Sequence, residues 1–466
     1  MSVSRSISER ARGQWGTRLG FVLAAAGSAI GLGNIWKFPY ITGKNGGGVF
    51  VLLYLVSIAL IGIPVMIAEI MIGRRAQRSP VGAFQKLRGE GTTWRVVGWM
   101  GVVAGFLILS YYSVVGGWTL NYALMSINRC FIDQTPEQIE KAFETLYHAS
   151  DINLFWHFVF MLATVGIVLG GVQKGIESWS RVLLPVLFVV LGVLVVDGMF
   201  QPGFKRAAWF LFSPRPEQLD PAGVLEALGQ SFFTLSLGMG ALLTYGSYLP
   251  KDRDIVGSSV IVAVLDTIVA LCACLVIFPI IFSFDIAETT GPGLVFQSMP
   301  VALGRMAGGM VLSILFFVLL FFAALTSAIS LLEVVVSTMI DQLGWSRPKT
   351  VLITGALIFV FGIPSAVSGS GAVFSAWTEI FGKNFFDTVD SLATGWILPL
   401  GGLFIAIFVG WVLPDEDRVE EFQGSRLARL YPVWIFALRY IVPGAIFLLW
   451  LFSVEILPKA WLVPEP

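Results

Sequence analysis

The sequence predicts an all-α membrane protein with a 5+5 inverted repeat, in which the first and sixth helices are discontinuous and one extra helix follows. Only 13% of its 466 residues are charged, and the mean hydropathy is +0.81. Soluble domains carry about 25% charged residues. Apolar segments of roughly the 20 residues that a membrane-spanning helix needs recur along the whole chain. Glycine clusters interrupt two of these segments, five spans apart.

The apolar segments divide the chain into eleven candidate spans. They are expected at residues 15–42, 47–73, 96–124, 153–171, 178–200, 224–250, 256–283, 303–341, 350–369, 385–413 and 432–456. These lengths exclude barrel strands, which alternate over about 10 residues. Within lipid, only a helix satisfies its own backbone over such lengths.

The spans suggest a division into a tail, two repeats and a last span. We expect a cytoplasmic N-terminal tail over 1–14 and a first inverted repeat over 15–200. A second repeat with its outer loops would cover 201–413, and an inner loop, the eleventh span and an external C-terminus would cover 414–466. Lys and Arg concentrate in the tail and in alternate loops, which places the N-terminus in the cytoplasm.

Charge and cysteine usage exclude several classes of function. Thirty Lys and Arg balance thirty Asp and Glu, so no nucleic-acid partner is expected. Three cysteines argue against a disulfide framework. The sequence contains no HExxH, CxxC or GxSxG motif, which disfavours metal and hydrolase chemistry.

The two glycine clusters are the main local signals. The first span contains GSAIGLGN, residues 27–34, and the sixth contains SLGMG, residues 236–240. Glycine inside a helix costs about 1 kcal/mol relative to alanine. One such cluster is more simply explained by close helix packing through small residues. Two clusters in corresponding positions of two halves favour broken helices with a binding site at the bilayer midplane.

A broken helix exposes backbone groups that can bind ions. Free amides near Leu32 and Gly33 would attract a carboxylate, and free carbonyls would attract a cation. The carbonyls concerned are those of Gly27, Ala29 and Ile30, and Asn34 adds an amide oxygen. Ligation by oxygen alone suits a hard cation.

Isolated polar residues in other spans extend this hypothesis. Asp266 lies in VIVAVLDTIVALCACLV without a charged neighbour, and an acid within a span is a functional candidate with a bound cation as its partner. Thr326 and Ser327 lie in the apolar eighth span. The alternative for these two hydroxyls is a bond back to their own helix.

Charged residues near the ends of the spans suggest gates. Lys37 and Asp390 could pair on the outer side, although Lys37 could also reach the interface by snorkelling. Arg12 and Asp341 could pair on the inner side, and a solvated face explains them equally well. Glu69 is expected to brace the first broken helix.

Aromatic residues and helix breakers give weaker signals. Tyr112 could place its phenol beside a carboxylate, or it could be a core aromatic; Phe233 could be a lid or ordinary packing. Gly175 and Pro185 weaken the inner start of the fifth span. This end could unwind to admit water, or it could equally be an ordinary helix start with a tolerated proline.

Taken together, these residues resemble the neurotransmitter:sodium symporter family, and its bacterial amino-acid transporters with eleven spans in particular. The resemblance covers almost the whole chain. It is carried by the strings WGTRLGFVLAAAGSAIGLGNIWKFPY, NGGGVFVLLYL, GIPVMIAEIMIGR, GVQKGIE, QSFFTLSLGMGALLTYGSY and FFAALTSAIS.

The resemblance implies a set of ligands for two sodium ions and one amino acid. The first sodium site would comprise Ala29, Asn34, Thr234 and Asp266 with the substrate carboxylate. The second would comprise Gly27, Ile30, Ala323, Thr326 and Ser327. The substrate pocket would comprise Ala29, Leu32, Gly33, Ile108, Tyr112, Phe233, Thr234, Ser236, Met239 and Leu331.

The resemblance also implies two gates. The outer gate would pair Lys37 with Asp390 under a Phe233 lid. The inner gate would pair Arg12 with Asp341, and its supporting residues would be Trp15, Ser247 and Tyr248. The spacing from Gly175 to Pro185 is similar to the family's pattern for unwinding the fifth span.

Three departures from the family pattern shape the expected function. Lys37 replaces the usual Arg and lacks its bidentate fork, so a weaker gate is expected. Asp266 replaces the usual Asn, and its fixed negative charge predicts transport that does not need chloride. Met239 is unbranched and adaptable, which suggests a pocket for medium to large apolar side chains.

The resulting expectation is a sodium-coupled symporter that imports branched-chain, Met or aromatic L-amino acids across a bacterial inner membrane by alternating access. The alternatives are a sodium-coupled carrier of another small amine or osmolyte, and an amino-acid sensor of the same fold that does not transport. No nucleophile–base pair lies within any span, so an enzyme is not expected. The sequence does not distinguish a monomer from a dimer.

Overall fold

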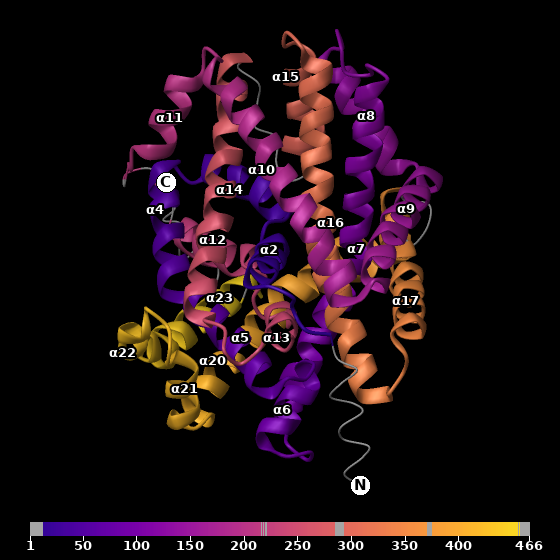
Figure 1. Ribbon diagram of the computed structural model, residues 1–466. Helices are drawn as coiled ribbons and strands as arrows, with labels where there is room; N and C mark the ends of the chain where they lie inside the picture. Colours follow the sequence, from indigo (N-terminus) through magenta and orange to yellow (C-terminus); the bar gives the residue numbers. More distant parts are fainter. Residues whose placement is uncertain are drawn as a thin grey trace.

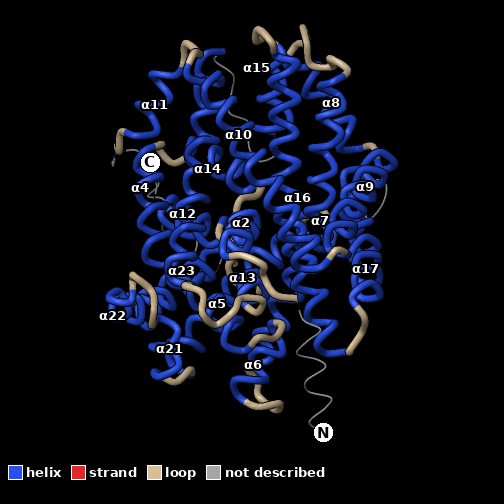
Figure 2. Tube along the Cα trace, viewed as in Figure 1, coloured by secondary structure: helices blue, strands red, loops and turns tan. Residues whose placement is uncertain are grey.

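The computed structural model describes residues 13–215, 217, 219, 221–284, 293–370, 375–454 and 456. Over these residues the chain is a bundle of helices and contains no strand (Figure 2). Most of the long helices run along one common direction, with α6 at one end of the bundle and α8, α11 and α15 at the other (Figure 1). Following the predicted orientation, we call the end with α6 the inner end.

Nine of the described helices are long and apolar enough to cross a membrane. They comprise Gly48–Ala76, Arg95–Ile127, Ser150–Leu169, Val172–Met199, Ile255–Phe284, Gly309–Leu343, Arg347–Ser370, Phe385–Val412 and Ala428–Ser453. In the labels of Figure 1 they contain, respectively, α4 (Gly48–Ser57) with α5 (Ile63–Ala76), α7, α9, α10 (Ser178–Met199), α14, α16, α17 (Arg347–Val367), α19 (Phe385–Asp390) with α20 (Leu398–Ile407), and α22 (Tyr431–Phe436) with α23 (Val442–Ser453).

The two remaining predicted spans are the broken ones. The first consists of α2, Arg18–Ala29, and a second helical part, Gly33–Lys44, which meet at 52°. The sixth consists of α12, Pro221–Thr234, and α13, Ala241–Gly246, with residues 235–240 outside any helix. Ser236 has a positive φ of 54°, and Gly238 and Gly240 have φ values of 79° and 74°. Glycine adopts this left-handed conformation without strain, so the cluster ends the helix as expected.

Shorter helices occupy the connections and were not predicted. They are α6 (Pro80–Arg88), α8 (Pro136–His148), α11 (Phe204–Phe212), α15 (Met299–Gly304), α18 (Ser375–Phe381) and α21 (Asp415–Phe422). Thr135 and Gln138 form a capping box at the start of α8. The predicted eighth span, 303–341, joins two elements at its start, because α15 ends at Gly304 and α16 begins at Gly309.

The broken helices lie inside the bundle, where α2 contacts α10, α14 and α16. Backbones approach closely where the inner half of the sixth span meets the second. A Cβ added to Gly73 on α5 would lie 1.9 Å from the Leu243 carbonyl oxygen, and one added to Gly246 would lie 2.6 Å from the Ile70 carbonyl oxygen. Small residues therefore allow α5 and α13 to pack backbone against backbone.

Candidate functional site

The first break replaces helical hydrogen bonds with bonds to side chains. Helix α2 ends at Ala29, and Ile30 is extended with ψ at 99°. The Gly31 amide donates to Asn34 Oδ1 at 3.0 Å, and the Leu32 amide donates to the Tyr112 hydroxyl at 3.3 Å. The amide near Leu32, predicted to attract a carboxylate, therefore faces a polar group that a ligand could replace.

The second break is bonded directly to the first. The Ser236 hydroxyl donates to the Ser28 carbonyl at 2.8 Å, and Gln230 Nε2 donates to the Gly33 carbonyl at 3.1 Å. Glu69 is fully buried and accepts a bond from the Gly238 amide at 2.6 Å. Glu69 was predicted to brace the first broken helix. That prediction is wrong, because its carboxylate instead caps the second break.

A buried acid lies at the centre of the first predicted cation site. Asp266 has no exposed surface. Its carboxylate accepts from Asn34 Nδ2 at 2.7 Å, from the Thr234 hydroxyl at 3.1 Å and from the Tyr54 hydroxyl at 3.1 Å. These three donors are neutral, and no ion pair to Asp266 occurs within the described part of the chain. A buried carboxylate without a cationic partner is costly, so this oxygen-rich cluster suits a bound cation.

The second predicted cation site lies between α2 and α16 (Gly309–Leu343). The Ser327 hydroxyl is 3.5 Å from the Gly27 carbonyl and 3.2 Å from the Ser28 carbonyl. The Thr326 hydroxyl donates to carbonyls of its own helix, at 3.1 Å for Ala323, as the alternative reading of this residue allowed. The structure therefore brings oxygens of Gly27, Ala323, Thr326 and Ser327 to one junction, next to Ile30 where α2 ends.

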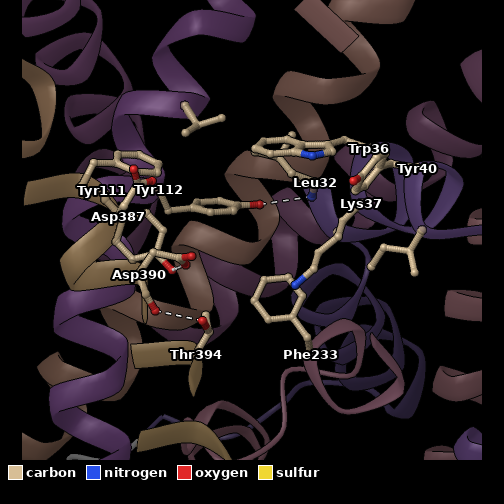
Figure 3. Close-up of a pocket in the computed structure, with 14 residues that line it drawn as sticks. Leu32, Trp36, Lys37, Tyr40, Tyr111, Tyr112, Phe233, Asp387, Asp390 and Thr394 are labelled. Carbon is tan, nitrogen blue, oxygen red and sulfur yellow. Dashed lines mark hydrogen bonds between the residues drawn. The ribbon is translucent and has the colours of Figure 1, made fainter. Parts of the chain in front are cut away.

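A cavity of about 310 Å³ lies on the outer side of the first break. Four predicted pocket residues line it, namely Leu32, Gly33, Tyr112 and Phe233 (Figure 3). The other six predicted pocket residues are buried and do not line it: Ala29, Ile108, Thr234, Ser236, Met239 and Leu331. The cavity thus leads from the outer end to part of the predicted pocket.

Both predicted outer-gate charges line this cavity, but they do not pair in this structure. Lys37 Nζ lies 4.5 Å from the centroid of the Phe233 ring, a cation–π contact. Asp390 instead accepts from the Tyr111 hydroxyl at 2.7 Å. Figure 3 shows the lysine directed to Phe233 and the aspartate beside Tyr111.

A network of hydrogen bonds surrounds Trp15 near the inner end. Its side chain is 4% exposed, and its indole Nε1 donates to the Tyr245 carbonyl at 2.8 Å. The Trp15 amide donates to the Tyr248 carbonyl at 3.1 Å, and the Tyr248 hydroxyl donates to Glu333 at 2.6 Å. Arg347 forms a bidentate ion pair with Glu333, at 3.0 and 2.5 Å. The predicted supports Trp15 and Tyr248 therefore belong to one buried network.

Other predicted inner residues are placed less directly. Arg12 lies outside the described residues. Asp341 accepts from the Ser79 amide at 2.7 Å, and the Ser247 hydroxyl donates to the Thr244 carbonyl at 2.7 Å. The start of the fifth span, which could unwind, is helical in this structure. A π-helical turn covers Val172–Glu177, and Pro185 lies inside α10.

Known proteins resemble this chain over most of its length. The profile of the Sodium:neurotransmitter symporter family matches residues 12–149 and 131–460. The chain belongs to this family. It is 39% identical over 453 residues to the sodium-dependent transporter YhdH of Bacillus subtilis, covering 97% of this chain and 100% of that protein. It is 34% identical over 447 residues to a sodium-dependent transporter of Haemophilus influenzae, covering 94% and 97% of the two chains.

A solved structure agrees with the fold of this symporter. The crystal structure of MhsT in complex with L-phenylalanine superposes with a TM-score of 0.86 at 46% identity, covering 95% of this chain and 100% of that chain. The chain is therefore a sodium-dependent, multi-pass transporter of the family, and its relatives are transporters and not enzymes.

Several residues that contact the site were not predicted from the sequence. Tyr54 is fully buried against Asp266, Tyr111 contacts Asp390, and Gln230 bonds to the first break. Each acts across the bundle on another span, so no local pattern marks it. The one signal available was a polar group placed within an otherwise apolar span.

Proposed function

We propose that the symporter imports hydrophobic L-amino acids, either branched-chain residues, Met or aromatics, together with two sodium ions and without chloride. It would act in the inner membrane of a bacterium, with the N-terminus in the cytoplasm and the C-terminus outside. The observation that carries this proposal is the buried Asp266 carboxylate, which is bonded to the first broken helix through Asn34 at 2.7 Å.

The carboxylate group of an amino acid fits the first break. The Leu32 amide now bonds to the Tyr112 hydroxyl at 3.3 Å, and both groups line the outer cavity. A substrate carboxylate would accept from both, because a charged acceptor forms stronger bonds than a neutral hydroxyl. Its other oxygen would complete the first sodium site with Ala29, Asn34, Thr234 and Asp266, so that substrate and ion bind together.

Asp266 supports independence from chloride. Two sodium ions and the substrate ammonium bring three positive charges, whereas the substrate carboxylate and Asp266 bring two negative charges. A fixed carboxylate therefore supplies negative charge that a bound anion would otherwise provide. On the empty return step, Asp266 would be protonated, since a buried acid without a cation is unfavourable.

The apolar walls support a hydrophobic side chain. Ile108, Met239 and Leu331 are at most 5% exposed and carry no polar atom capable of strong hydrogen bonding. Met239 lies between Gly238 and Gly240, where its flexible side chain can adapt to ligands of different size. MhsT, at 46% identity, was crystallised with L-phenylalanine.

The arrangement fits the outward-facing state of an alternating-access cycle. Trp15 is buried and bonded near the inner end, where it would close the inner side, while a cavity leads inward from the outer end. Substrate binding would bring Phe233 over the pocket and Lys37 toward Asp390. Release inward would then require the Trp15 contacts to break and the sodium held between Gly27 and Ser327 to leave.

The test is uptake of labelled leucine and phenylalanine into proteoliposomes with and without an inward sodium gradient. We expect uptake that depends on sodium and does not change when gluconate replaces chloride. A competition panel should show displacement by branched-chain, Met and aromatic amino acids. A strict need for chloride, or displacement by glycine and alanine alone, would contradict the corresponding part of the proposal. Binding without uptake would instead identify a sensor.

A further inference from the structure

Tyr111 connects two spans at the mouth of the outer cavity. It lies on α7 (Arg95–Ile127), and its hydroxyl donates to Asp390 Oδ1 at 2.7 Å, at the end of α19. The tyrosine is 6% exposed, and its ring packs edge-on against Phe386 at 5.2 Å. The ring is therefore fixed by packing, and its hydroxyl is aimed at one carboxylate oxygen.

The opposite charge of the gate is held by another aromatic ring. Lys37 Nζ lies 4.5 Å from the centroid of Phe233, on the other wall of the same cavity (Figure 3). In this structure each charge of the predicted outer gate therefore has an aromatic partner: Tyr111 for Asp390, and Phe233 for Lys37. An ion pair between them would form if Lys37 left Phe233 and Asp390 turned from Tyr111 toward it.

We propose that Tyr111 is a positioning residue of the outer gate, whose hydroxyl holds Asp390 away from Lys37 and so favours the open cavity. This inference rests on the proposed function, in which closure of the gate follows substrate binding. During closure, Lys37 replaces Tyr111 as the partner of Asp390. The affinity for substrate is then set partly by a residue that does not touch the substrate.

The expected size follows from the type of bond. A hydrogen bond to a charged group contributes enough to change an equilibrium constant about tenfold. If that bond exists only in the open arrangement, removing it shifts the population toward the closed arrangement by up to this factor. The apparent affinity for substrate rises accordingly, and substrate dissociates more slowly.

The decisive variant is Tyr111→Phe, which removes the hydroxyl and keeps the ring against Phe386. A Val115→Cys probe placed in the cavity wall, in a Cys130→Ser background because Cys130 is exposed, reports the open cavity through its rate of reaction with a membrane-impermeant thiol reagent. We expect Tyr111→Phe to slow this reaction by up to about tenfold. Tyr40→Phe is the matched control, since Tyr40 lines the same cavity on the side away from Asp390 (Figure 3).

A double-mutant cycle shows whether the effect acts through the gate. In a Lys37→Gln background there is no cation for Asp390 to join, so Tyr111→Phe should leave the reaction rate unchanged. Faster or unchanged labelling in Tyr111→Phe alone, or an effect that persists with Lys37→Gln, would overturn the proposal. Faster labelling would mean that Tyr111 aims Asp390 at Lys37.

A second variant covers the case in which Tyr111→Phe does not fold. Asp390→Asn removes the charge needed for the ion pair, and we expect its labelling to be at least as fast as that of the parent. Slower labelling in Asp390→Asn would also overturn the proposal. Because these reactions need no substrate, they test the gate even if no amino acid proves to be transported, which would contradict the proposed function alone.

Discussion

Asn34 Nδ2 donates to Asp266 Oδ1 at 2.7 Å, so the first broken helix is bonded to the seventh span at the predicted first sodium site. The bond joins residues 232 positions apart in the sequence. An ion bound at the proposed site would contact both segments. Sodium binding would therefore change the position of the first span relative to α14 (Ile255–Phe284).

Replacing Asp266 tests the source of negative charge. Asp266→Asn keeps the size of the side chain and removes its charge, so the proposed sodium site would lose its charged protein ligand. We expect the sodium concentration for half-maximal uptake to rise by about tenfold or more. The measurement is uptake of labelled leucine against external sodium.

Asp254→Asn is the control for that variant, because Asp254 lies outside the site and is 3.9 Å from Arg18 in a partly exposed pair. It should leave the sodium dependence unchanged, since exposed pairs contribute little. An Asp266→Asn transporter with normal sodium dependence would remove this residue from the cation site.

Gly31→Ala tests the fit between the first break and α16. A Cβ at Gly31 would lie 2.7 Å from Ser327 Oγ and 3.2 Å from the Tyr112 hydroxyl. Both oxygens belong to the predicted site, so one methyl group should displace them. We expect sodium binding, measured by radiolabelled sodium in detergent, to weaken by about tenfold.

The matched control is Gly192→Ala on α10, where an added Cβ meets no atom within 4 Å. It should bind sodium as the parent does, and it should be slightly more stable, because alanine favours helix over glycine. Equal sodium affinity in both variants would show that the break can move to accept the methyl group.

Trp15→Ala tests the inner seal. The change leaves a cavity and removes the bond from the indole to the Tyr245 carbonyl. Burial of Trp contributes about 3–5 kcal/mol where it is replaced by Ala. If this energy stabilises the sealed arrangement, the inner side should open, and substrate affinity should fall because the outward-facing form is less populated.

Two measurements check these effects. Substrate binding measures the loss of affinity, and the reaction rate of a Ser247→Cys variant with a thiol reagent added from the inner side measures the opening. Trp179→Ala is the control, since Trp179 is 47% exposed on α10. It should change neither quantity. A Trp15→Ala protein with unchanged inner reactivity would show that Trp15 does not seal the inner end.

The buried Glu333–Arg347 pair should be needed for stability. Glu333 is fully buried, and the Arg347 side chain is 22% exposed. Glu333→Gln leaves the guanidinium without its carboxylate, which typically destabilises a protein by about 3–5 kcal/mol. We expect a clearly lower unfolding temperature in detergent.

The double variant Glu333→Gln/Arg347→Gln should recover part of that loss, because no unpaired charge remains. Asp252→Asn serves as the control, since Asp252 is 73% exposed beside Arg253. If the Glu333→Gln protein is as stable as this control, the Glu333–Arg347 pair does not contribute to stability.

The sequence predicted the fold well because its signals are local. Long apolar segments marked the spans, and the glycines of SLGMG marked the second break, where Gly238 and Gly240 adopt the left-handed conformation. The short connecting helices were missed, since they have no apolar length to mark them. The eighth span was predicted too long, because Leu303 and Gly304 are apolar but belong to α15.

The candidate site was predicted less completely, since its contacts cross the bundle. Asp266 was identifiable because a charge within an apolar span is rare. Its partner Tyr54 was not, because a tyrosine in an apolar span usually serves packing. Glu69 was assigned to the first break, but the structure places it at Gly238, and no pattern in either segment distinguishes the two.

The contact of α5 with α13 limits where the sixth span can bend. At Gly73 and Gly246 the two backbones touch without side chains between them. A sliding motion there would bring main-chain atoms too close together, so we expect the inner halves of the second and sixth spans to move together as one rigid unit. The stretch 235–240, which lies outside any helix, separates that unit from α12.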